Sequence, residues 1–422
     1  MVNLESPLSE SAAIVVVGVR NAGKSSLINA LFGKDVAIVS AEPGTTTDPV
    51  TRKMELPGWG PVAFVDTAGI DDDGELGLKR VAKTEERLAS CSAAVFATPG
   101  HRSPIPAETT LLERLRTCGK PFLVALTHAD LPLDPEKARA FGLPESGAKG
   151  SVPPFAVPVK RVDGRSGAGA AELRTAIAAL ADGGVVEPGP LEGVAREGDH
   201  FLLVAPIDLA APKGRLIQPQ TETIRDALDR DCMVTVVKER ELYDAYRSFK
   251  ARPRLVITDS QAFSKVAADI PEDQPLTSFS ILFARKKGEL DAFLSGLDAL
   301  SRFPVDGRVF VMEACSHHRG ADDIASVKIP RLFSRMVTPT ARLETVRKIP
   351  DDLCASDLVI HCAACMMTGN SLKARMEKFR AAGVPVTNYG LFMAWANGLL
   401  PRAIEPFPEF AGVRKEALSR EL

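Results

Sequence analysis

Short runs of apolar residues alternate with amphipathic stretches along most of the chain. In residues 13–180 the apolar runs AAIVVVGV, VAFVDTA, AAVFAT, PFLVAL and FAVPV predict strands, and the helical pattern AAELRTAIAAL closes the block. Strands and helices that alternate at this spacing form parallel sheets. This part of the chain is therefore predicted to be a doubly wound α/β domain.

Two further blocks repeat the alternation. The segment ADGGVVEPGPLEGVAREGD is rich in Gly, Pro and acidic residues and is typical of a linker. After it, FLLVAPIDL, MVTVVK and RLVITDS predict strands with helices between them. A second break, DIPEDQP, precedes the predicted strands SILFA, RVFVMEA, DLVIH and VPVTNY. We therefore expect two further small α/β domains.

The composition and net charge narrow the class of protein and its expected partners. With 422 residues, 45% apolar and 25% charged, the chain is too long for one ordinary core and has the balance of a soluble globular protein. The net charge of -2 argues against a nucleic-acid partner. Since no apolar run approaches the roughly 18 residues of a membrane span and the polar N-terminus lacks a signal pattern, we expect a cytoplasmic protein without a membrane partner.

One motif points to phosphate binding. The strand AAIVVVG runs into GVRNAGKS, which fits G-x-x-x-x-G-K-[ST] in the required strand–loop–helix setting. Its glycines allow backbone N–H groups to turn toward phosphates, Lys24 would reach the β- and γ-phosphates, and Ser25 would hold Mg²⁺. The predicted nucleotide contacts of this loop are Gly18, Asn21, Ala22, Gly23, Lys24, Ser25 and Ser26.

Two later motifs fit the same site. PGTTTD supplies Thr46, a candidate to close on Mg²⁺ and the γ-phosphate, and DTAG supplies Asp66 for the Mg²⁺ shell and the Gly69 N–H for the γ-phosphate. In this order the motifs resemble the TrmE-Era group of GTPases, which implies GTP as the nucleotide. The guanine-reading motif of that group, Asn-Lys-x-Asp, is replaced here by Thr-His-Ala-Asp, of which Asp130 can still accept from guanine. Its Ser-Ala-Lys base loop is not recognisable near residues 159–167.

The same resemblance bears on turnover. In the TrmE-Era group an Asn at the position of Asn21 ligates K⁺ beside the phosphates, and here Ile70 follows DTAG where a water-orienting Gln would stand. Hydrolysis is therefore expected to be slow, Mg²⁺-dependent and stimulated by K⁺. Lys24, Thr46 and Asn21 are the predicted catalytic residues.

A second cluster of reactive residues lies near the C-terminus. Cys315 and His317 follow the strand RVFVMEA, His361, Cys362 and Cys365 follow DLVIH, and Asn388 and Tyr389 follow VPVT. If these strands are parallel, the three loops meet at one edge of a sheet, where open α/β sheets bind ligands. Three thiolates suit an iron–sulfur cluster, two thiolates with two imidazoles suit zinc, and a redox thiol pair is a further possibility. The remaining cysteines, Cys91, Cys118 and Cys232 as small core residues and Cys354 in a turn, are expected to have no chemical role.

The modules together resemble a known family. A TrmE-Era-like G domain, a middle block containing PIDLAAPKGRLIQPQ and a terminal C-x-H…H-C-x-x-C resemble the [FeFe]-hydrogenase maturation GTPases of the HydF family. The resemblance implies a P-loop NTPase G domain at residues 1–185, a dimerisation domain at 190–272 and a [4Fe-4S] cluster domain at 275–422. It assigns Cys315, Cys362 and Cys365 as cluster ligands, with His317 or His361 as a possible fourth.

What the resemblance implies for function is a scaffold or carrier. Such a protein is a homodimer that assembles the diiron subcluster of the hydrogenase and delivers it to apo-[FeFe]-hydrogenase, working with radical maturation enzymes. The alternative is a TrmE-Era-like GTPase with a structural zinc module that acts in RNA modification or ribosome assembly. Against the alternative, the sequence shows no basic patch with interleaved aromatic residues.

Overall fold

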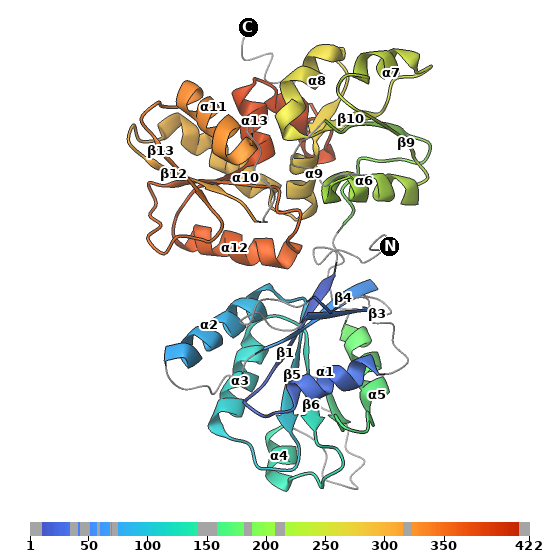
Figure 1. The fold of residues 1–422 in the computed structure, drawn as a ribbon, viewed down its shortest axis with the longest axis vertical. Helices are drawn as coiled ribbons and strands as arrows, with labels where there is room; N and C mark the ends of the chain where they lie inside the picture. The colour runs from blue at the N-terminus through green and yellow to red at the C-terminus, as the bar shows by residue number, and fades with distance from the viewer. Residues whose placement is uncertain are drawn as a thin grey trace. The chain divides into compact units, whose positions relative to one another are not determined.

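The computed structural model of the chain divides into two compact units, residues 1–186 and 187–422 (Figure 1). The predicted boundary at residues 272–275 falls inside the second unit. The structure describes residues 11–33, 41–42, 51–56, 60–67, 69, 75–141, 158–180, 188–206, 216–314 and 323–412.

The first unit is built on one seven-stranded sheet. In spatial order its strands are β2 (Ala41–Glu42), β3 (Thr51–Leu56), β4 (Gly60–Asp66), β1 (Ala12–Val17), β5 (Ala93–Pro99), β6 (Phe122–Thr127) and β7 (Val159–Val162). The strands from β4 to β7 are parallel, as predicted, whereas β2 and β3 add an antiparallel edge. The inner strand β5 is buried along its whole length, which is typical of a parallel sheet covered on both faces.

Helices cover both faces of this sheet. They are α1 (Lys24–Phe32), α2 (Glu75–Ser90), α3 (Pro106–Thr117), α4 (Pro135–Ala140) and α5 (Ala170–Ala179). One buried cluster contains Leu27 of α1 and Leu173 of α5, and a separate one contains Leu111 of α3. Figure 1 accordingly shows α1 and α5 on one side and α3 on the other. The P-loop fold predicted from the sequence is confirmed.

The second unit holds two four-stranded sheets. The strands of the first are β11 (Leu276–Ser278), β10 (Leu255–Thr258), β8 (His200–Val204) and β9 (Met233–Val237). Those of the second are β13 (Arg342–Val346), β12 (Arg308–Met312), β14 (Leu358–His361) and β15 (Val386–Asn388). Neighbouring strands are parallel in both sheets.

Helices connect these strands. They are α6 (Gln218–Asp229), α7 (Leu242–Ser248), α8 (Phe263–Asp269), α9 (Phe279–Lys286), α10 (Leu290–Asp298), α11 (Ile329–Met336), α12 (Gly369–Ala381), α13 (Tyr389–Ala396) and α14 (Leu400–Ile404). Shorter helical turns are η3 (Ser260–Ala262), η4 (Ala299–Arg302), η5 (Ile324–Lys328) and η6 (Pro408–Phe410). One buried cluster extends from Phe201 in the first sheet through Phe293 to Phe310 in the second. The second and third predicted blocks therefore share a single hydrophobic core.

One predicted strand is wrong. The run SILFA lies in α9, where the Ser278 hydroxyl caps the helix by accepting a hydrogen bond from the Ile281 N–H at 3.3 Å. Five of the eight residues of α9 are buried, and the helix packs against strands of both sheets. These five include the four consecutive residues 281–284, and a short continuous apolar run of this kind cannot be distinguished from a buried strand by its periodicity.

Candidate functional site

The phosphate-binding loop joins β1 to α1. Gly23 caps α1 with a φ of 83°, and Asn21, which is exposed, has a φ of 58°. Left-handed residues of this kind turn successive backbone N–H groups to one side, which creates an anion-binding concavity. At Gly18 a Cβ atom would lie 2.2 Å from the Ala97 carbonyl oxygen of β5. Glycine is therefore required there because the loop touches the neighbouring strand.

Lys24 and Ser25 are the first two residues of α1. The Lys24 side chain is buried and its Nζ donates to the carbonyl oxygens of Gly18 (3.1 Å) and Val19 (2.9 Å), so the ammonium lies within the loop. Ser25 Oγ donates to Asp66 Oδ2 at 2.5 Å. The two predicted Mg²⁺ ligands, one from α1 and one from β4, are thus brought together.

The Asp66 carboxylate fits a cation. Asp66 ends β4 and pairs in register with Val16 of β1, and the adjacent Thr67 hydroxyl donates to the Val16 carbonyl at 2.7 Å. Asp66 Oδ1 is buried and has no hydrogen-bond partner among the described residues. A buried carboxylate oxygen without a donor is costly, and Mg²⁺ is a ligand that satisfies it.

Thr127 replaces the missing Asn of the guanine motif. Its hydroxyl, which is buried at the end of β6, donates to the Ala22 carbonyl oxygen at 2.8 Å. It also lies 3.1 Å from Nδ1 of His128, a residue in the left-handed region with a φ of 59°. This hydrogen bond, the Thr127–Ala22 tether, links the loop of residues 127–130, which replaces the guanine motif and is called the base loop below, to the phosphate-binding loop. Asp130 is exposed. The departure from Asn-Lys-x-Asp therefore keeps a connection between the two loops.

A further loop at this edge was not recognised from the sequence. After β7, the Asp163 carboxylate accepts hydrogen bonds from the backbone N–H groups of Arg165 (3.0 Å) and Ser166 (2.9 Å) and from the Ser166 hydroxyl. These bonds lower the pKa of Asp163 to about 2. Gly164 lies so close to α1 that a Cβ atom there would be 2.8 Å from Ser26 Cβ. The pattern DGRSG could have been used to predict a turn here. Only the close approach of Gly164 to Ser26 shows that this turn lies next to the phosphate-binding loop.

Other predicted residues lie outside the described ranges. Thr46 and Ile70 belong to this group in the first unit, and Cys315 and His317 in the second. Gly69 is described and is buried. The assignments of Thr46, Cys315 and His317 stay predictions.

The second candidate site lies at the carboxyl edge of the β13–β12–β14–β15 sheet. Met312, His361 and Asn388 end neighbouring parallel strands and are partners in register. The prediction that the three loops meet at one edge is therefore confirmed for the described strand ends.

Cys362 is held against the end of β12. Its N–H donates to the Met312 carbonyl at 2.9 Å. Its Sγ accepts from the backbone N–H groups of Ala314 at 3.2 Å and of Ala364 at 3.4 Å. Ala364 is buried and has a φ of 51°, which is unusual for a residue with a side chain. The Cys-x-x-Cys segment is therefore a tight turn whose first sulfur is surrounded by backbone donors.

His361 lies beneath this turn and is completely buried. Arg375 Nη1 lies 3.2 Å from His361 Nε2, and because an Arg can only donate, Nε2 accepts. Nδ1 then carries the proton and donates to the Cys362 carbonyl at 2.7 Å. Burial lowers the pKa of His361 to about 4. The imidazole is therefore neutral, and a metal bond to it would replace one of these hydrogen bonds.

Asn388 adds a buried donor beside the cysteine turn. Its Oδ1 accepts from the Ser280 hydroxyl at 2.8 Å and from the Gly390 N–H at 2.7 Å. Its Nδ2 is buried and has no hydrogen-bond partner among the described residues. A bound group with acceptor atoms would satisfy it. The described residues contain no cluster of three or more metal-ligating side chains, but that set leaves out Cys315 and His317.

The other cysteines are mostly as predicted. Cys91 and Cys232 are buried, and burial raises the pKa of Cys91 to about 12. Cys118 is exposed at the end of α3, so its prediction as a core residue is wrong. The helix turns its Leu111 and Leu115 side chains inward and leaves the capping residue at the surface.

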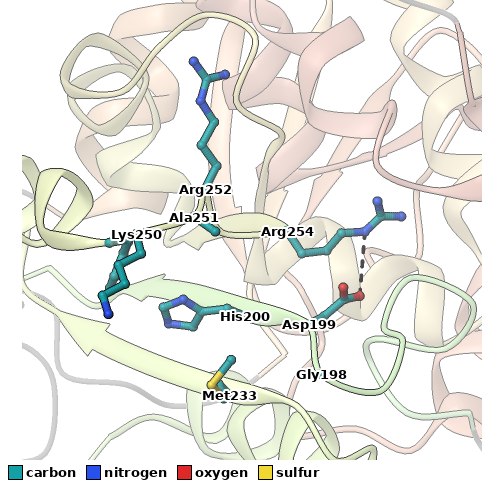
Figure 2. A pocket seen from close by; sticks show the side chains of 9 residues that line it. Gly198, Asp199, His200, Met233, Lys250, Ala251, Arg252 and Arg254 are labelled. Atoms are coloured by element: carbon teal, nitrogen blue, oxygen red, sulfur yellow. Dashed lines mark ion pairs between the residues drawn. The ribbon is translucent and has the colours of Figure 1, made fainter.

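A cavity of about 480 Å³ lies in the second unit, where strands β8, β9 and β10 begin. His200, Lys250, Arg252 and Arg254 are among its lining residues. Figure 2 shows that the basic side chains diverge, with Arg252 extending away from His200 and Arg254 toward Asp199, 3.9 Å away. The cavity therefore does not gather its charges around a common point. No described helix is long and apolar enough to cross a membrane.

Three family models match successive parts of the chain. Residues 13–128 match the 50S ribosome-binding GTPase model. Residues 191–288 match the hydrogen maturase F dimerization domain, and residues 291–406 match the hydrogen maturase F tetramerization domain.

Individual relatives are similar over the GTPase part. The tRNA modification GTPase MnmE of Novosphingobium aromaticivorans is 42% identical over 107 residues, which are 25% of this chain and 24% of the relative. That of Acidiphilium cryptum is 45% identical over 108 residues, which are 24% of this chain and 25% of the relative. The chain thus spans about a quarter of the length of these relatives.

Solved structures with a similar fold include Era from Aquifex aeolicus. It is 18% identical, with a TM-score of 0.32, and the match covers 54% of this chain and 93% of Era. The G domain of FeoB from T. maritima is 20% identical, with a TM-score of 0.28, over 40% of this chain and 99% of that domain. The two maturase F models together span about half of the chain and follow a GTPase domain. The chain therefore belongs to the hydrogen maturase F (HydF) family.

Proposed function

We propose that the chain is a GTP-hydrolysing scaffold that carries a [4Fe-4S] cluster in its second unit. In this proposal it assembles the diiron subcluster of the hydrogenase H-cluster and delivers it to apo-[FeFe]-hydrogenase. The observation that carries the proposal is the meeting of three parallel strand ends at the cysteine turn. There the thiol of Cys362 receives a hydrogen bond from Ala314, the residue directly before Cys315.

The proposed cluster ligands are Cys315, Cys362 and Cys365. The donor set fits such a group because Cys362 Sγ already accepts two backbone N–H bonds, and N–H donors to sulfur stabilise cluster thiolates. When bound, the cluster supplies a one-electron redox centre. Of the two candidate histidines we place His317 first, since both nitrogens of His361 are already hydrogen-bonded.

Metal analysis after strictly anaerobic purification tests this proposal. We expect iron and sulfide, and we expect Cys315→Ser, Cys362→Ser and Cys365→Ser each to remove most of the iron–sulfur absorption. Cys354→Ser is the matched control, because Cys354 is exposed and its Sγ lies 3.1 Å from the Ser356 hydroxyl. Stoichiometric zinc without iron would instead favour the alternative, a GTPase with a zinc module that acts in RNA modification or ribosome assembly.

For the nucleotide we propose that Lys24 contacts the phosphates and that Ser25, Asp66 and Thr46 surround Mg²⁺. The short Ser25–Asp66 contact and the orphaned oxygen of Asp66 support this arrangement. Asn21 is proposed to ligate K⁺, so hydrolysis should be faster in K⁺ than in Na⁺. It should also be slow, because Ile70 stands in the sequence where a water-orienting Gln would. Equal rates in the two salts would contradict the assignment of Asn21.

Asp130 is proposed to read guanine. The tether from Thr127 to Ala22 supports this role, because it fixes the base loop relative to the phosphate loop. GTP should therefore displace a labelled guanine nucleotide much better than ATP does. Equal displacement by the two nucleotides would show that Asp130 alone does not select the base.

We further propose that the chain is a homodimer through residues 190–272 and docks with radical maturation enzymes and apo-hydrogenase. Support comes from β9, the edge strand of its sheet, where Met233 is 59% and Val236 is 42% exposed. An exposed apolar edge strand is a template for pairing with another chain. Val236→Glu should therefore yield monomers in light scattering, whereas an unchanged mass would contradict dimerisation at this edge.

A further inference from the structure

We infer that Lys287 is a positioning residue of the cysteine turn. From the end of α9 it would hold the backbone around Cys365 in the shape that presents both thiolates, and it would place a positive charge against the turn. This inference rests on the proposed function, since it concerns how the chain supports its cluster.

Lys287 contacts the turn directly. The residue caps α9 through its own N–H and is only 3% exposed. Its Nζ donates to the Ala364 carbonyl at 2.5 Å and also to the Met367 carbonyl. These two carbonyls flank Cys365 in the sequence. One side chain therefore bridges the two sides of the turn that carries Cys365.

The contact bears on the geometry of the first cysteine as well. Ala364 is held in the left-handed region, a conformation that persists only where its surroundings impose it. Its carbonyl accepts from Lys287, and its N–H donates to Cys362 Sγ at 3.4 Å. The two bonds lie on either side of the same α-carbon. Lys287 therefore helps to fix the donor that Cys362 receives.

The positive charge of Lys287 should also affect the redox potential of a bound cluster, because the side chain is buried. A buried ammonium interacts strongly with nearby negative charge because the medium has a low dielectric constant. Reduction of a bound cluster adds an electron, so a cation held against the turn that carries the thiolates favours the reduced form and raises the potential. Arg375, which donates to His361 Nε2, is a second cation near the turn, and it is the same in every variant, so a shift in Lys287→Met reports the loss of Lys287. Replacing Lys287 by a neutral residue should therefore make the potential more negative.

A matched control lies in the same unit. Arg402 is also buried and also donates to backbone carbonyls, those of Pro271 (2.6 Å) and Gln274 (3.0 and 3.1 Å). Those carbonyls precede β11 in the first sheet, not the cysteine turn. Arg402→Met therefore reports the cost of losing a buried cation without any effect on the turn.

The test uses the full chain reconstituted with iron and sulfide, as wild type, Lys287→Met, Lys287→Arg and Arg402→Met. We measure the midpoint potential by spectroelectrochemical titration, the paramagnetic resonance spectrum of the reduced cluster and the rate of iron loss to a chelator. Lys287→Met should show a more negative potential and several-fold faster iron loss. Lys287→Arg should stay near the wild-type potential, and Arg402→Met should lower thermal stability without moving the potential.

Different outcomes would refute the role of Lys287 and the proposed function. A wild-type potential and a wild-type chelation rate in Lys287→Met would overturn the role of Lys287 and leave the proposed function standing. So would an equal shift of the potential in Arg402→Met. A wild-type chain that takes up no iron–sulfur cluster would refute the proposed function itself. If Lys287→Met does not fold, a Lys287→Arg variant that keeps the wild-type potential supports the charge argument, and one that loses it refutes that argument.

Discussion

The hydroxyl of Thr127 offers a sharp test of how this chain binds its nucleotide. Thr127→Val keeps the shape of the side chain and removes the hydrogen bond to the Ala22 carbonyl, together with the contact of the hydroxyl with His128 Nδ1. Ala22 is fully buried and Thr127 is 4% exposed, so water cannot replace the lost donor. A buried carbonyl left without its donor costs about 1–3 kcal/mol.

Much of this cost should appear in nucleotide binding. The hydrogen bond from Thr127 to Ala22 joins the phosphate-binding loop to the loop that carries Asp130. In the proposed binding mode the nucleotide touches both of these loops. Since about 1.4 kcal/mol corresponds to a tenfold change, GTP affinity should fall roughly 10-fold and by no more than about 100-fold. The assay is titration of a fluorescent GTP analogue, with denaturant unfolding of the same samples as a measure of stability.

Two variants complete the experiment. Thr127→Ser keeps the hydroxyl and should bind GTP nearly as well as the wild type. Thr98→Val removes a different buried hydroxyl, one that donates to Glu108 at 2.6 Å, and should reduce stability more than binding. If Thr127→Val bound GTP as tightly as the wild type, the tether would have no part in holding the two loops together.

Three further perturbations test other parts of the first unit. Gly18→Ala would place a Cβ atom 2.2 Å from a backbone oxygen of β5, so β1 and β5 must move apart and fluorescent GTP binding should be largely lost. The folded-state pKa of Asp163, about 2, lies below its ordinary value of 3.8, so its stabilising contribution is present above pH 4 and is lost as the pH falls toward 2. Asp163→Asn should therefore flatten the pH dependence of the urea midpoint in that window. Lys137 and Glu108 form a fully buried ion pair at 2.7 Å, so Lys137→Met should cost about 3–5 kcal/mol in denaturant unfolding. Adding Glu108→Gln to that variant should recover part of the loss.

The sequence was most informative where chemistry depends on short spacing. The phosphate-binding loop could be predicted because Gly18, Lys24 and Ser25 lie in one short segment that runs from the end of β1 into the start of α1. The meeting of the Cys362 turn with the end of β12 could be predicted because parallel strands place their carboxyl ends at one edge. In both cases local pattern and sheet topology were sufficient.

What could not be predicted depends on contacts between distant segments. Nothing in the sequence around Thr127 says that its hydroxyl reaches Ala22, because the same residue type is common at strand ends. The loop after β7 becomes part of the site only through Gly164 against Ser26. Lys287 stands in an ordinary basic run, RKKG, and only its burial against the cysteine turn distinguishes it from its neighbours.

The antiparallel strand β3 and the edge strand β13 were missed for a different reason. Their sequences, TRKMEL and RLETV, are largely polar, since each is only partly buried. Strands of this kind carry too few apolar residues to stand out from loops.

The position of α9 between two sheets has a practical consequence for anyone who wishes to work with the cysteine-bearing half alone. A fragment that begins at residue 275 would keep β11 but lose β10, the strand with which β11 pairs. It would also expose apolar side chains that the first sheet now covers, since both sheets share one buried cluster. Such a fragment should aggregate when expressed. The shortest piece that retains the whole cluster of buried residues begins near residue 187. The cysteine turn and the region matched by the dimerization model therefore belong to one folding unit.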